Sequence, residues 1–534
     1  MHHKRKQGLP SWAAVAAALV VSASLLAVVR SVYAKPEQEE AVLSSESASA
    51  ANFLPPGAMA ELEQANHANE QIEKQALQLL NTNLDSIHQI QTLGKLEIFD
   101  KTLSVGRNES CSTCHTPTTG YTGPSQILNL TTVAYPGSVQ GRFGPRKPQS
   151  YGYATLAPIL HFNATQQDFY GGNFWDMRAT GARLQSAAAE QSQGPPTNPV
   201  EMGLPDSACV AYRLSQGKYA SLFVKVWGAS LQSIQFPADA EKTCSTPVGK
   251  NGVGSQLSLS TEDRNRANAV SDQFALAIAA YEASPGVNAF SSKFDAFLAG
   301  QATLTPQEQH GYELFNGQGK CNTCHLTGNA NGATGGSVAD AAPLFTDFTS
   351  SNLGLPKNLD LPFYHENKPD QHGFVANPQG LAFVDLGVGA FLSGAQGTPV
   401  PDQSWIPLAP QFDGKVQVPT LRNVDLRPYP GFVKSYMHNG YLKSLKEVVH
   451  FYNTRDTKCP TANDPNVKKT CWPQAEVTAN EDTTIGNLGL SDSDEDDIVA
   501  FMKTLTDGYT SQSAVNLTPA VQASMRAHRQ SIQH

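Results

Sequence analysis

Two short motifs carry the residue types that can do chemistry in this chain. Residues 111–115 read Cys-Ser-Thr-Cys-His, and residues 321–325 read Cys-Asn-Thr-Cys-His. Two cysteines three positions apart, followed directly by a histidine, form the attachment signature of a c-type haem. Each thiol joins a vinyl group of the porphyrin, and the imidazole that follows binds the iron. The sequence therefore predicts two covalently attached c-type haems. Their ligands are predicted to be Cys111, Cys114 and His115 for the first haem, and Cys321, Cys324 and His325 for the second.

Two other interpretations of a Cys-x-x-Cys pair are a lone zinc half-site and a redox-active dithiol. With only 8 cysteines and 14 histidines among 534 residues, two complete matches by chance are improbable. The haem interpretation is therefore favoured.

The remaining cysteines and the net charge narrow the class of protein. A chain of 534 residues is long enough for two or three domains. Its net charge of −9 gives no basic surface for nucleic acid. Four cysteines are left over, an even number that indicates two disulfides in an oxidising compartment. Proximity favours Cys209–Cys244 and Cys459–Cys471, although three pairings are possible.

The N-terminus is typical of a targeting segment. Residues 2–6 are basic, residues 12–29 are almost wholly apolar, and residues 32–34 fit a small-residue cleavage site. We therefore expect a signal peptide over residues 1–34. The length of the apolar run and the position of Arg30 leave a retained membrane anchor open. In either case the folded part is exported, and in a bacterium it lies in the periplasm.

Helical periodicity dominates the segments that position the motifs. Apolar residues recur at helical spacing over residues 60–93, and again over residues 261–283 behind a capping serine. Residues 305–308 read Thr-Pro-Gln-Glu, a capping box that opens a short helix before the second motif. A last helix is expected within residues 491–508. The fold class is therefore mainly α, with long irregular loops rich in glycine and proline.

The two haem motifs have dissimilar surroundings, which indicates two cytochrome c-like haem domains and not a tandem array. We expect a flexible linker over residues 35–59, an N-terminal haem domain over residues 60–290 and a C-terminal haem domain over residues 291–508. Residues 509–534 form a tail.

Six further motifs follow in order along residues 90–510. They are Leu93-Gly94-Lys95 with Phe99-Asp100 and Leu103-Ser104, Phe174-Trp175-Asp176 with Arg178-Ala179, Asn198-Pro199-Val200-Glu201-Met202, Phe294-Asp295 with Leu298-Ala299-Gly300, the run 418–424, and Tyr436-Met437-His438-Asn439-Gly440. Together with the two haem motifs they resemble the bacterial di-haem cytochrome c peroxidase family, which includes the MauG-like enzymes.

The resemblance implies a division of labour between the two haems. The N-terminal haem binds peroxide, the C-terminal haem exchanges electrons, and Trp175 lies between them. The active-site glutamate falls on Glu201 and the glutamine on Gln191. A carboxyl group in an apolar pocket suits this chemistry, because peroxide at iron needs a base to move a proton between its oxygens. A structural carboxylate at Glu201 and a core role for Trp175 remain the alternatives.

The chain departs from the family at the first iron. Many members cap this iron in the resting state with a histidine from the loop after the first motif. Residues 116–160 contain no histidine, and His161 is the first candidate. We therefore expect the first iron to rest five-coordinate or water-ligated, open to peroxide.

A second departure concerns the other iron. Peroxidase members place a methionine fourteen residues after the histidine that is His438 here, and this chain has Tyr452 at that position. A tyrosine ligand is the MauG-like arrangement. Met437 as a rival ligand, and Tyr452 as a plain core residue, remain open. Methionine raises a haem potential, whereas an anionic phenolate lowers it.

Two further expectations come from the resemblance. Arg422 is expected to bind haem propionates, a pairing that suits arginine. Family members also hold a calcium ion between their domains, largely through backbone carbonyls. This chain has extra residues between Arg427 and Tyr436, near that site, and no clear asparagine counterpart upstream. Calcium is therefore an expectation that rests on the resemblance alone.

The sequence thus predicts an oxidoreductase that reduces hydrogen peroxide to water. Its electrons come from a small cytochrome c, a cupredoxin or a protein substrate, and pass through the second haem. One alternative is a MauG-like oxidase that modifies aromatic residues of a partner protein. Another is a non-catalytic di-haem electron carrier, although a carrier favours two six-coordinate irons. A homodimer is left open.

Overall fold

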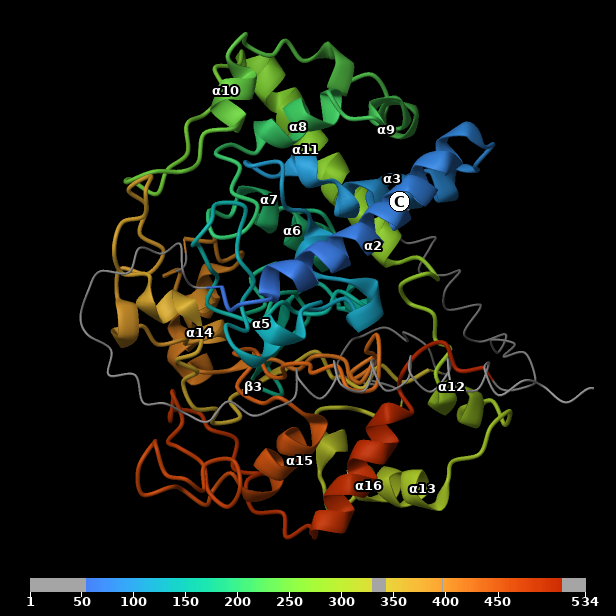
Figure 1. Cartoon of the computed structure of the whole chain (residues 1–534), viewed down its shortest axis with the longest axis vertical. Coiled ribbons are helices and arrows are strands. Elements are labelled where there is room, and N and C mark those ends of the chain that lie inside the picture. The colour runs from blue at the N-terminus through green and yellow to red at the C-terminus, as the bar shows by residue number, and fades with distance from the viewer. Residues whose placement is uncertain (1–53, 329–341, 396, 511–534) are drawn as a thin grey trace, which may run out of the picture. The chain divides into compact units, whose positions relative to one another are not determined.

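The computed structural model describes residues 54–328, 342–395 and 397–510. The predicted signal or anchor segment, most of the linker and nearly all of the tail lie outside these ranges. Figure 1 shows a chain built mainly from helices and long loops, which confirms the expected fold class. No helix in the described ranges combines the length and hydrophobicity needed to cross a membrane.

The first half of the chain contains most of the helices around the first motif. These are α2 (Ala58–Gln78), α3 (Ser86–Phe99), α4 (Cys111–Cys114), α5 (Gln126–Leu130), α6 (Ala187–Ser192), α7 (Gly194–Thr197), α8 (Ala208–Ser215), α9 (Ala220–Trp227), α10 (Ala240–Cys244) and α11 (Thr261–Glu282). The expected helical stretch over residues 60–93 is divided between α2 and α3. The division has a local cause, because the Asp85 side chain accepts a hydrogen bond from the His88 backbone N–H at 2.9 Å and caps a new helix.

The second half holds α12 (Lys293–Leu298), α13 (Pro306–Asn316), α14 (Val388–Leu392), α15 (Leu445–Thr454) and α16 (Asp492–Lys503). The predicted capping box at Thr305 opens α13, and Ser491 caps α16. Single turns of 3₁₀ helix occur at η2 (Leu79–Asn81), η3 (Lys101–Leu103), η4 (Pro117–Thr119), η5 (Ala154–Leu156), η6 (Leu231–Ser233), η7 (Cys321–Thr323), η8 (Pro362–His365) and η9 (Gly380–Ala382), and a longer one at η10 (Gln403–Phe412).

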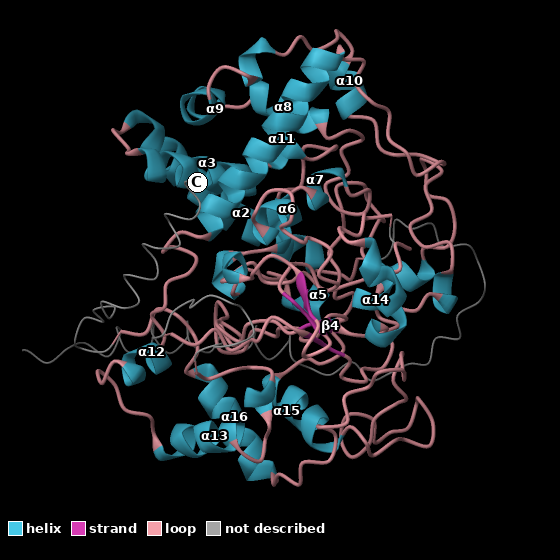
Figure 2. Cartoon of the chain, turned by 180° about the vertical axis from the view of Figure 1, so that it is seen from behind, coloured by secondary structure: helices cyan, strands magenta, loops and turns pink. Residues whose placement is uncertain are grey.

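The strands are short and antiparallel. β1 (His161–Asn163) pairs with β2 (Asp168–Tyr170), and β3 (Ser350–Ser351) pairs with β4 (Val416–Gln417). Figure 2 shows the strands between the group of helices that contains α8 and α11 and the group that contains α13, α15 and α16.

A glycine marks the closest helix crossing in each half. In α3, a Cβ on Gly94 would collide with the carbonyl oxygen of Ala277 in α11. In α13, a Cβ on Gly311 would collide with the carbonyl oxygen of Asp497 in α16. In both halves, then, the helix before the haem motif packs backbone to backbone against the last helix of that half. The two halves share this helix packing at a glycine despite their dissimilar sequences.

The buried apolar side chains form clusters that largely follow the two halves. The largest lies within residues 76–287, and the next lies within residues 294–505. Smaller clusters combine the halves, for example Phe169 and Met177 with Phe391 and Phe412. The expected boundary near residue 290 remains a proposal, which the separation of the two main clusters supports.

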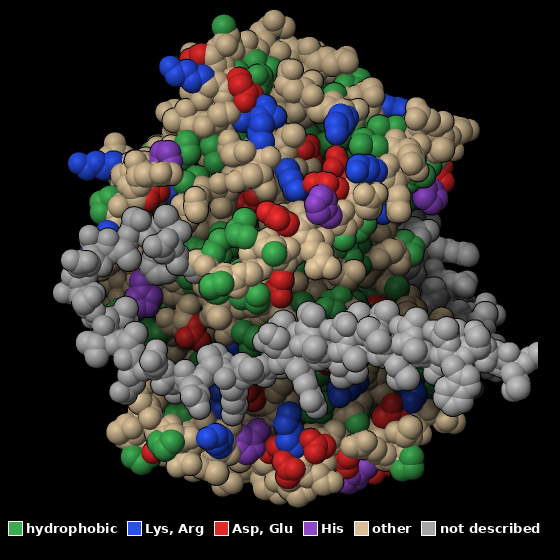
Figure 3. All heavy atoms as spheres, viewed as in Figure 1, with side chains coloured by type: hydrophobic (Ala, Val, Ile, Leu, Met, Phe, Trp, Pro, Cys, Tyr) green, Lys and Arg blue, Asp and Glu red, His purple; other side chains and the backbone are tan. Residues whose placement is uncertain are grey.

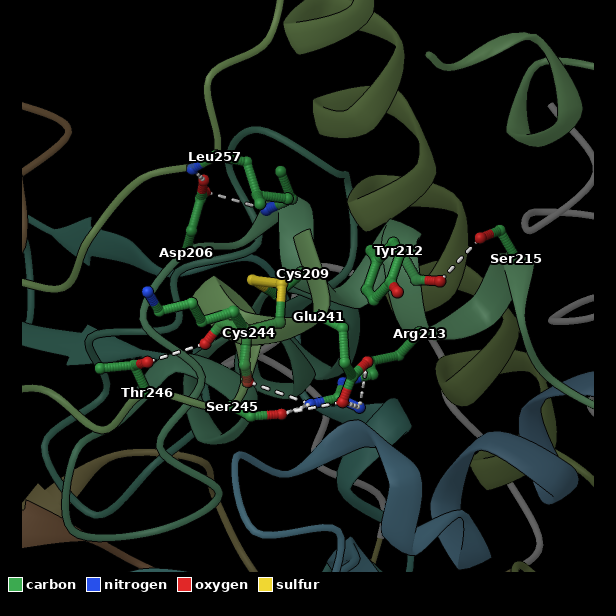
Figure 4. Close-up of a disulfide and its surroundings, with 12 residues drawn as sticks. Asp206, Cys209, Tyr212, Arg213, Ser215, Glu241, Cys244, Ser245, Thr246 and Leu257 are labelled. Atoms are coloured by element: carbon green, nitrogen blue, oxygen red, sulfur yellow. Dashed lines mark hydrogen bonds and ion pairs between the residues drawn. A yellow bond between two sulfur atoms is a disulfide. The ribbon is translucent and has the colours of Figure 1, made fainter. Parts of the chain in front are cut away.

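Both predicted disulfides are present. Cys209–Cys244 joins α8 to α10 in the insertion over residues 205–258, and Cys459–Cys471 closes a short loop. Figure 4 shows the first bridge beside the fully buried Arg213, which donates to Glu241 at 2.9 Å and to the Cys244 carbonyl at 3.1 Å. The bridge, and the ion pair between the buried Arg213 and the exposed Glu241, hold α10 against α8.

Acidic and basic side chains are interspersed on the face drawn in Figure 3 wherever described residues are visible. The visible surface therefore offers no single field of one sign to steer a charged partner.

Candidate functional site

A cavity beside the first motif collects most of the residues predicted to act there. The short helix α4 carries both cysteines, and His115 follows it directly. The His115 Nδ1 donates to the Tyr121 carbonyl oxygen at 3.1 Å, which leaves Nε2 as the nitrogen that can bind a metal. Burial lowers the pKa of His115 to about 4, so the imidazole is neutral, as a ligand must be. The lining includes Cys111, Cys114, His115, Trp175, Gln191 and Glu201.

A second cavity lies beside the second motif and has the same construction. The His325 Nδ1 donates to the Phe345 carbonyl oxygen at 2.8 Å, and burial lowers the pKa of this histidine to about 4. Cys321, Cys324, His325, Tyr452, Met437 and Arg422 line this cavity.

The residues present fit two covalently held haems. All four motif cysteines are free thiols, and each pair lines the same cavity as the histidine that follows it. In both sites a backbone carbonyl fixes the imidazole tautomer with Nε2 available for iron. This donor set is that of a c-type haem.

Glu201 is held at the wall of the first cavity. The Asn198 side-chain N–H₂ donates to Glu201 Oε1 at 2.8 Å. Burial raises the pKa of Glu201, although Arg178 and the bond from Asn198 oppose the shift. A carboxyl group with a raised pKa can both accept and return a proton near neutral pH.

Glu109 is a cavity residue that sequence reasoning missed. Its side chain is buried, lines the first cavity and approaches the Cys114 sulfur. Burial, followed by the nearby charge of Glu201, raises the pKa of Glu109 to about 8. Its only signal in the sequence is an acidic residue two positions before a haem motif.

Trp175 lies between the two cavities and contributes to the lining of both. Its Nε1–H donates to the Lys147 carbonyl oxygen at 3.1 Å, and the backbone N–H of Lys147 donates to the His438 carbonyl oxygen at 2.8 Å. The tryptophan carbonyl accepts from the Gln417 N–H at 2.8 Å. These bonds join residues of both halves.

A buried ion-pair network behind Trp175 was also missed. Arg146 donates to Asp176 at 2.7 Å and to both oxygens of Asp385 at 2.7 Å, and Arg178 pairs with Asp176 at 2.7 Å. Burial disfavours the Asp176 carboxylate, but Arg146 and Arg178 outweigh it and lower its pKa. The network therefore stays charged and fixes the segment that carries Trp175.

Tyr452 projects from α15 into the second cavity. Burial, with Cys324 and Cys321 nearby, raises the pKa of the Tyr452 phenol far above its ordinary value. The phenol therefore needs a cation, such as a metal ion, to become a phenolate. Met437 lines the same cavity, so both candidate ligands remain.

The sequence singled out two other residues, Arg422 and His161. The Arg422 guanidinium donates to both oxygens of Asp295, at 3.0 and 2.8 Å, and to the Pro343 carbonyl oxygen at 2.7 Å. Two of its five N–H groups remain for a propionate. His161 lies in β1 with its Nδ1 on the Ile159 carbonyl oxygen, and it is not part of the lining of the first cavity.

Residues 88–303 match the family described as di-haem cytochrome c peroxidase. The methylamine utilization protein MauG of Paracoccus denitrificans is 30% identical over 421 residues, which cover 78% of this chain and 88% of that protein. The cytochrome c551 peroxidase of Nitrosomonas europaea is 27% identical over 265 residues, 49% of this chain and 57% of that protein. The crystal structure of the diheme peroxidase BthA from Burkholderia thailandensis has the same fold, with a TM-score of 0.56 and 24% identity over 80% of this chain and 89% of that one.

Proposed function

Because this chain belongs to the di-haem cytochrome c peroxidase family and is an oxidoreductase with two c-type haems, we propose that it reduces hydrogen peroxide to water in the periplasm. The reaction consumes one peroxide, two protons and two electrons and yields two waters. The electrons come from an external donor, a small cytochrome c, a cupredoxin or a protein substrate. A homodimer stays a prediction, and no step of the proposal uses a calcium ion.

When bound, the first haem supplies the iron at which peroxide binds, and the second supplies electron exchange. Glu201 would accept a proton from one oxygen of the peroxide and return it to the other, so that the O–O bond could break with one oxygen leaving as water. The amide of Gln191, which lines the same cavity, is suited to orient the peroxide by hydrogen bonding. Burial raises the Glu201 pKa, which favours the return of the proton after it has been accepted.

The observation that carries this proposal is that Glu201 and Gln191 line one cavity with His115. A passive electron carrier has no use for a proton-transfer carboxyl group beside its haem.

Glu201→Gln tests the proposal. In the holoprotein we expect this variant to lower peroxide-dependent oxidation of a reduced donor by about 10²–10⁴-fold, the usual contribution of general acid–base catalysis. The haem content and the absorption spectrum should stay those of the wild type. Glu262→Gln, at an exposed position in α11, is the matched control. Activity within about twofold of the wild type in Glu201→Gln, with both haems attached, would contradict the proposed role.

A second candidate function, oxidation of a partner protein's aromatic residues, is favoured by one observation. Among the α15 side chains that line the second cavity, Tyr452 occupies the position at which peroxidase members place a methionine, and a tyrosine there is the MauG-like arrangement. Rapid oxidation of reduced cytochrome c by peroxide favours the first function. Slow oxidation together with mass changes in a partner protein favours the second.

A further inference from the structure

Lys434 is a buried lysine that joins the two halves of the chain. Its side chain is 5% exposed. Its Nζ donates to the Thr119 carbonyl oxygen at 2.9 Å, to that of Leu426 at 2.9 Å and to that of Asn423 at 3.4 Å. Thr119 ends the turn that follows the first haem motif, whereas the other two carbonyls belong to the second half. One side-chain nitrogen therefore links backbone from both halves.

The geometry requires an ammonium group. Three carbonyl oxygens surround the nitrogen, and only the protonated lysine has three N–H donors to satisfy them. A neutral amine would turn its lone pair toward a carbonyl oxygen and leave that buried acceptor unpaired.

Close backbone packing maintains this arrangement. Gly120 has a φ of +69°, and a Cβ there would lie 2.9 Å from the Asn423 carbonyl oxygen and 3.4 Å from Lys434 Nζ. Any side chain would therefore strain the backbone and push the two halves apart at the ammonium.

The charges around Lys434 do not suit a divalent cation. Burial, followed by the nearby charges of Lys147 and Arg427, lowers the pKa of Lys434 well below its ordinary value, and Asp425 acts in the opposite sense. The three carbonyl acceptors around Nζ also oppose this shift, because they stabilise the protonated form. Asp425 is itself paired with Arg427. Calcium takes six to eight oxygen ligands at 2.3–2.6 Å, usually with carboxylates among them. Here the converging carbonyls already bind an ammonium, and two more cations lie close by, so the residues of this region do not fit calcium.

We propose that the Lys434 ammonium performs the interdomain cation role that the family resemblance assigns to calcium. It locks the turn behind the first haem to the segment that carries Arg422 and Asn423, and no metal is needed. The turn matters because Tyr121, two residues after it, fixes the His115 ring through its carbonyl oxygen. Lys434 itself lines the second cavity. The inference does not depend on which reaction the two haems catalyse.

Calcium dependence of the wild-type holoprotein is the first test. The protein is dialysed against EGTA and then supplied with calcium or, as a control, magnesium. We expect the thermal midpoint to change by no more than about 1 °C, because an ion stabilises only a protein that has a site for it. The haem absorption spectrum should stay the same apart from baseline drift. A rise of about 3 °C or more with calcium alone would overturn the proposal.

Removal of the ammonium is the second test. Lys434→Met keeps the apolar stem but leaves buried carbonyls unpaired, so we expect the thermal midpoint to fall by about 5 °C. Lys503→Met, at an exposed position in α16, should not change the thermal midpoint.

In Lys434→Ala, added methylammonium should restore part of the loss in the thermal midpoint. Tetramethylammonium, which has no N–H donor, should not. An unchanged midpoint in Lys434→Met, or equal effects of the two amines, would contradict the proposal. If neither variant folds, the calcium titration of the wild type decides.

Discussion

Tyr452 and Met437 compete at the residue scale for the second iron. Both line the cavity that contains His325, but they come from different segments. Tyr452 projects from α15, whereas Met437 has a φ of +68° in the loop before it. An anionic oxygen ligand and a thioether move the haem potential in opposite directions, so the choice is measurable.

Tyr452→Phe should alter the second haem and leave the first unchanged. We expect a changed resting absorption spectrum and a potential raised by about 100 mV or more, within the ~0.8 V range that axial ligands span. A spectroelectrochemical titration measures both. Tyr441→Phe is the control, since Tyr441 is a half-buried tyrosine in contact with Lys468. An unchanged spectrum and potential in Tyr452→Phe would rule out this ligand.

Sequence reasoning found the residues tied to motifs and missed those made by contacts across the chain. The haem ligands follow from local spacing, and Glu201 follows from a motif. The pair Arg146–Asp385 joins residues 239 positions apart, so no local pattern reveals it. Glu109 shares the first cavity with Glu201, which lies 92 positions further along the chain, so its role there could not be read from its own neighbours in the sequence.

At the scale of elements, helix crossings at glycine position both haem motifs. An alanine in a helix interior is usually more stable than glycine by ~0.5–1 kcal/mol. Gly94→Ala and Gly311→Ala should do the opposite and lower the free energy of unfolding by about 1–3 kcal/mol each, because the methyl group meets a backbone carbonyl.

Denaturant unfolding of the holoprotein measures these effects. Gly431→Ala is the control, since a Cβ there has no atom within 4 Å. A gain in stability for either helix variant would show that the helices can separate to accommodate a methyl group. The capping box of α13 was predictable from four adjacent residues, but these crossings were not. They depend on partners more than 180 positions away.

Glu97 makes α3 sensitive to pH. Both of its carboxyl oxygens are buried without a hydrogen-bond partner in the described part of the chain. Burial, followed by the charge of Asp100, raises its pKa well above 4.5. The unfolded chain therefore releases this proton at lower pH than the folded chain does. The contribution of Glu97 to the free energy of unfolding is therefore fully present below about pH 4.3, and it is lost as the pH rises through the folded pKa.

Glu97→Gln should remove this slope. We expect the variant to be more stable than the wild type at pH 8, with a difference that shrinks by up to about 1.4 kcal/mol per pH unit as the pH falls toward 5. Glu63→Gln, exposed in α2, is the control. Thermal midpoints measured between pH 5 and pH 8 provide the comparison, and parallel curves for Glu97→Gln and the wild type would contradict the assignment.

At the scale of the whole molecule, the two halves meet through buried polar contacts as well as apolar ones. Tyr153 donates to Asp507 at 2.7 Å, Asn129 to the Val433 carbonyl oxygen at 3.0 Å, and Lys443 to the Asn129 carbonyl oxygen at 2.8 Å. Such bonds need both halves in register, so the two cavities keep a fixed relation across Trp175.

Trp175→Phe should uncouple the two sites while each remains intact. Phenylalanine fills most of the space but loses the indole N–H that binds the Lys147 carbonyl oxygen. If Trp175 carries electrons between the haems, peroxide-dependent oxidation of an external donor should fall by about tenfold or more, at least ~1.4 kcal/mol in the barrier. The stopped-flow reaction of peroxide with the donor-free enzyme should keep its rate, because Glu201 and His115 are untouched.

Trp405→Phe, in the apolar cluster around Phe169, is the matched control. Equal losses in both reactions would mean that Trp175 acts only by packing, since a core role damages the first cavity and the electron path together.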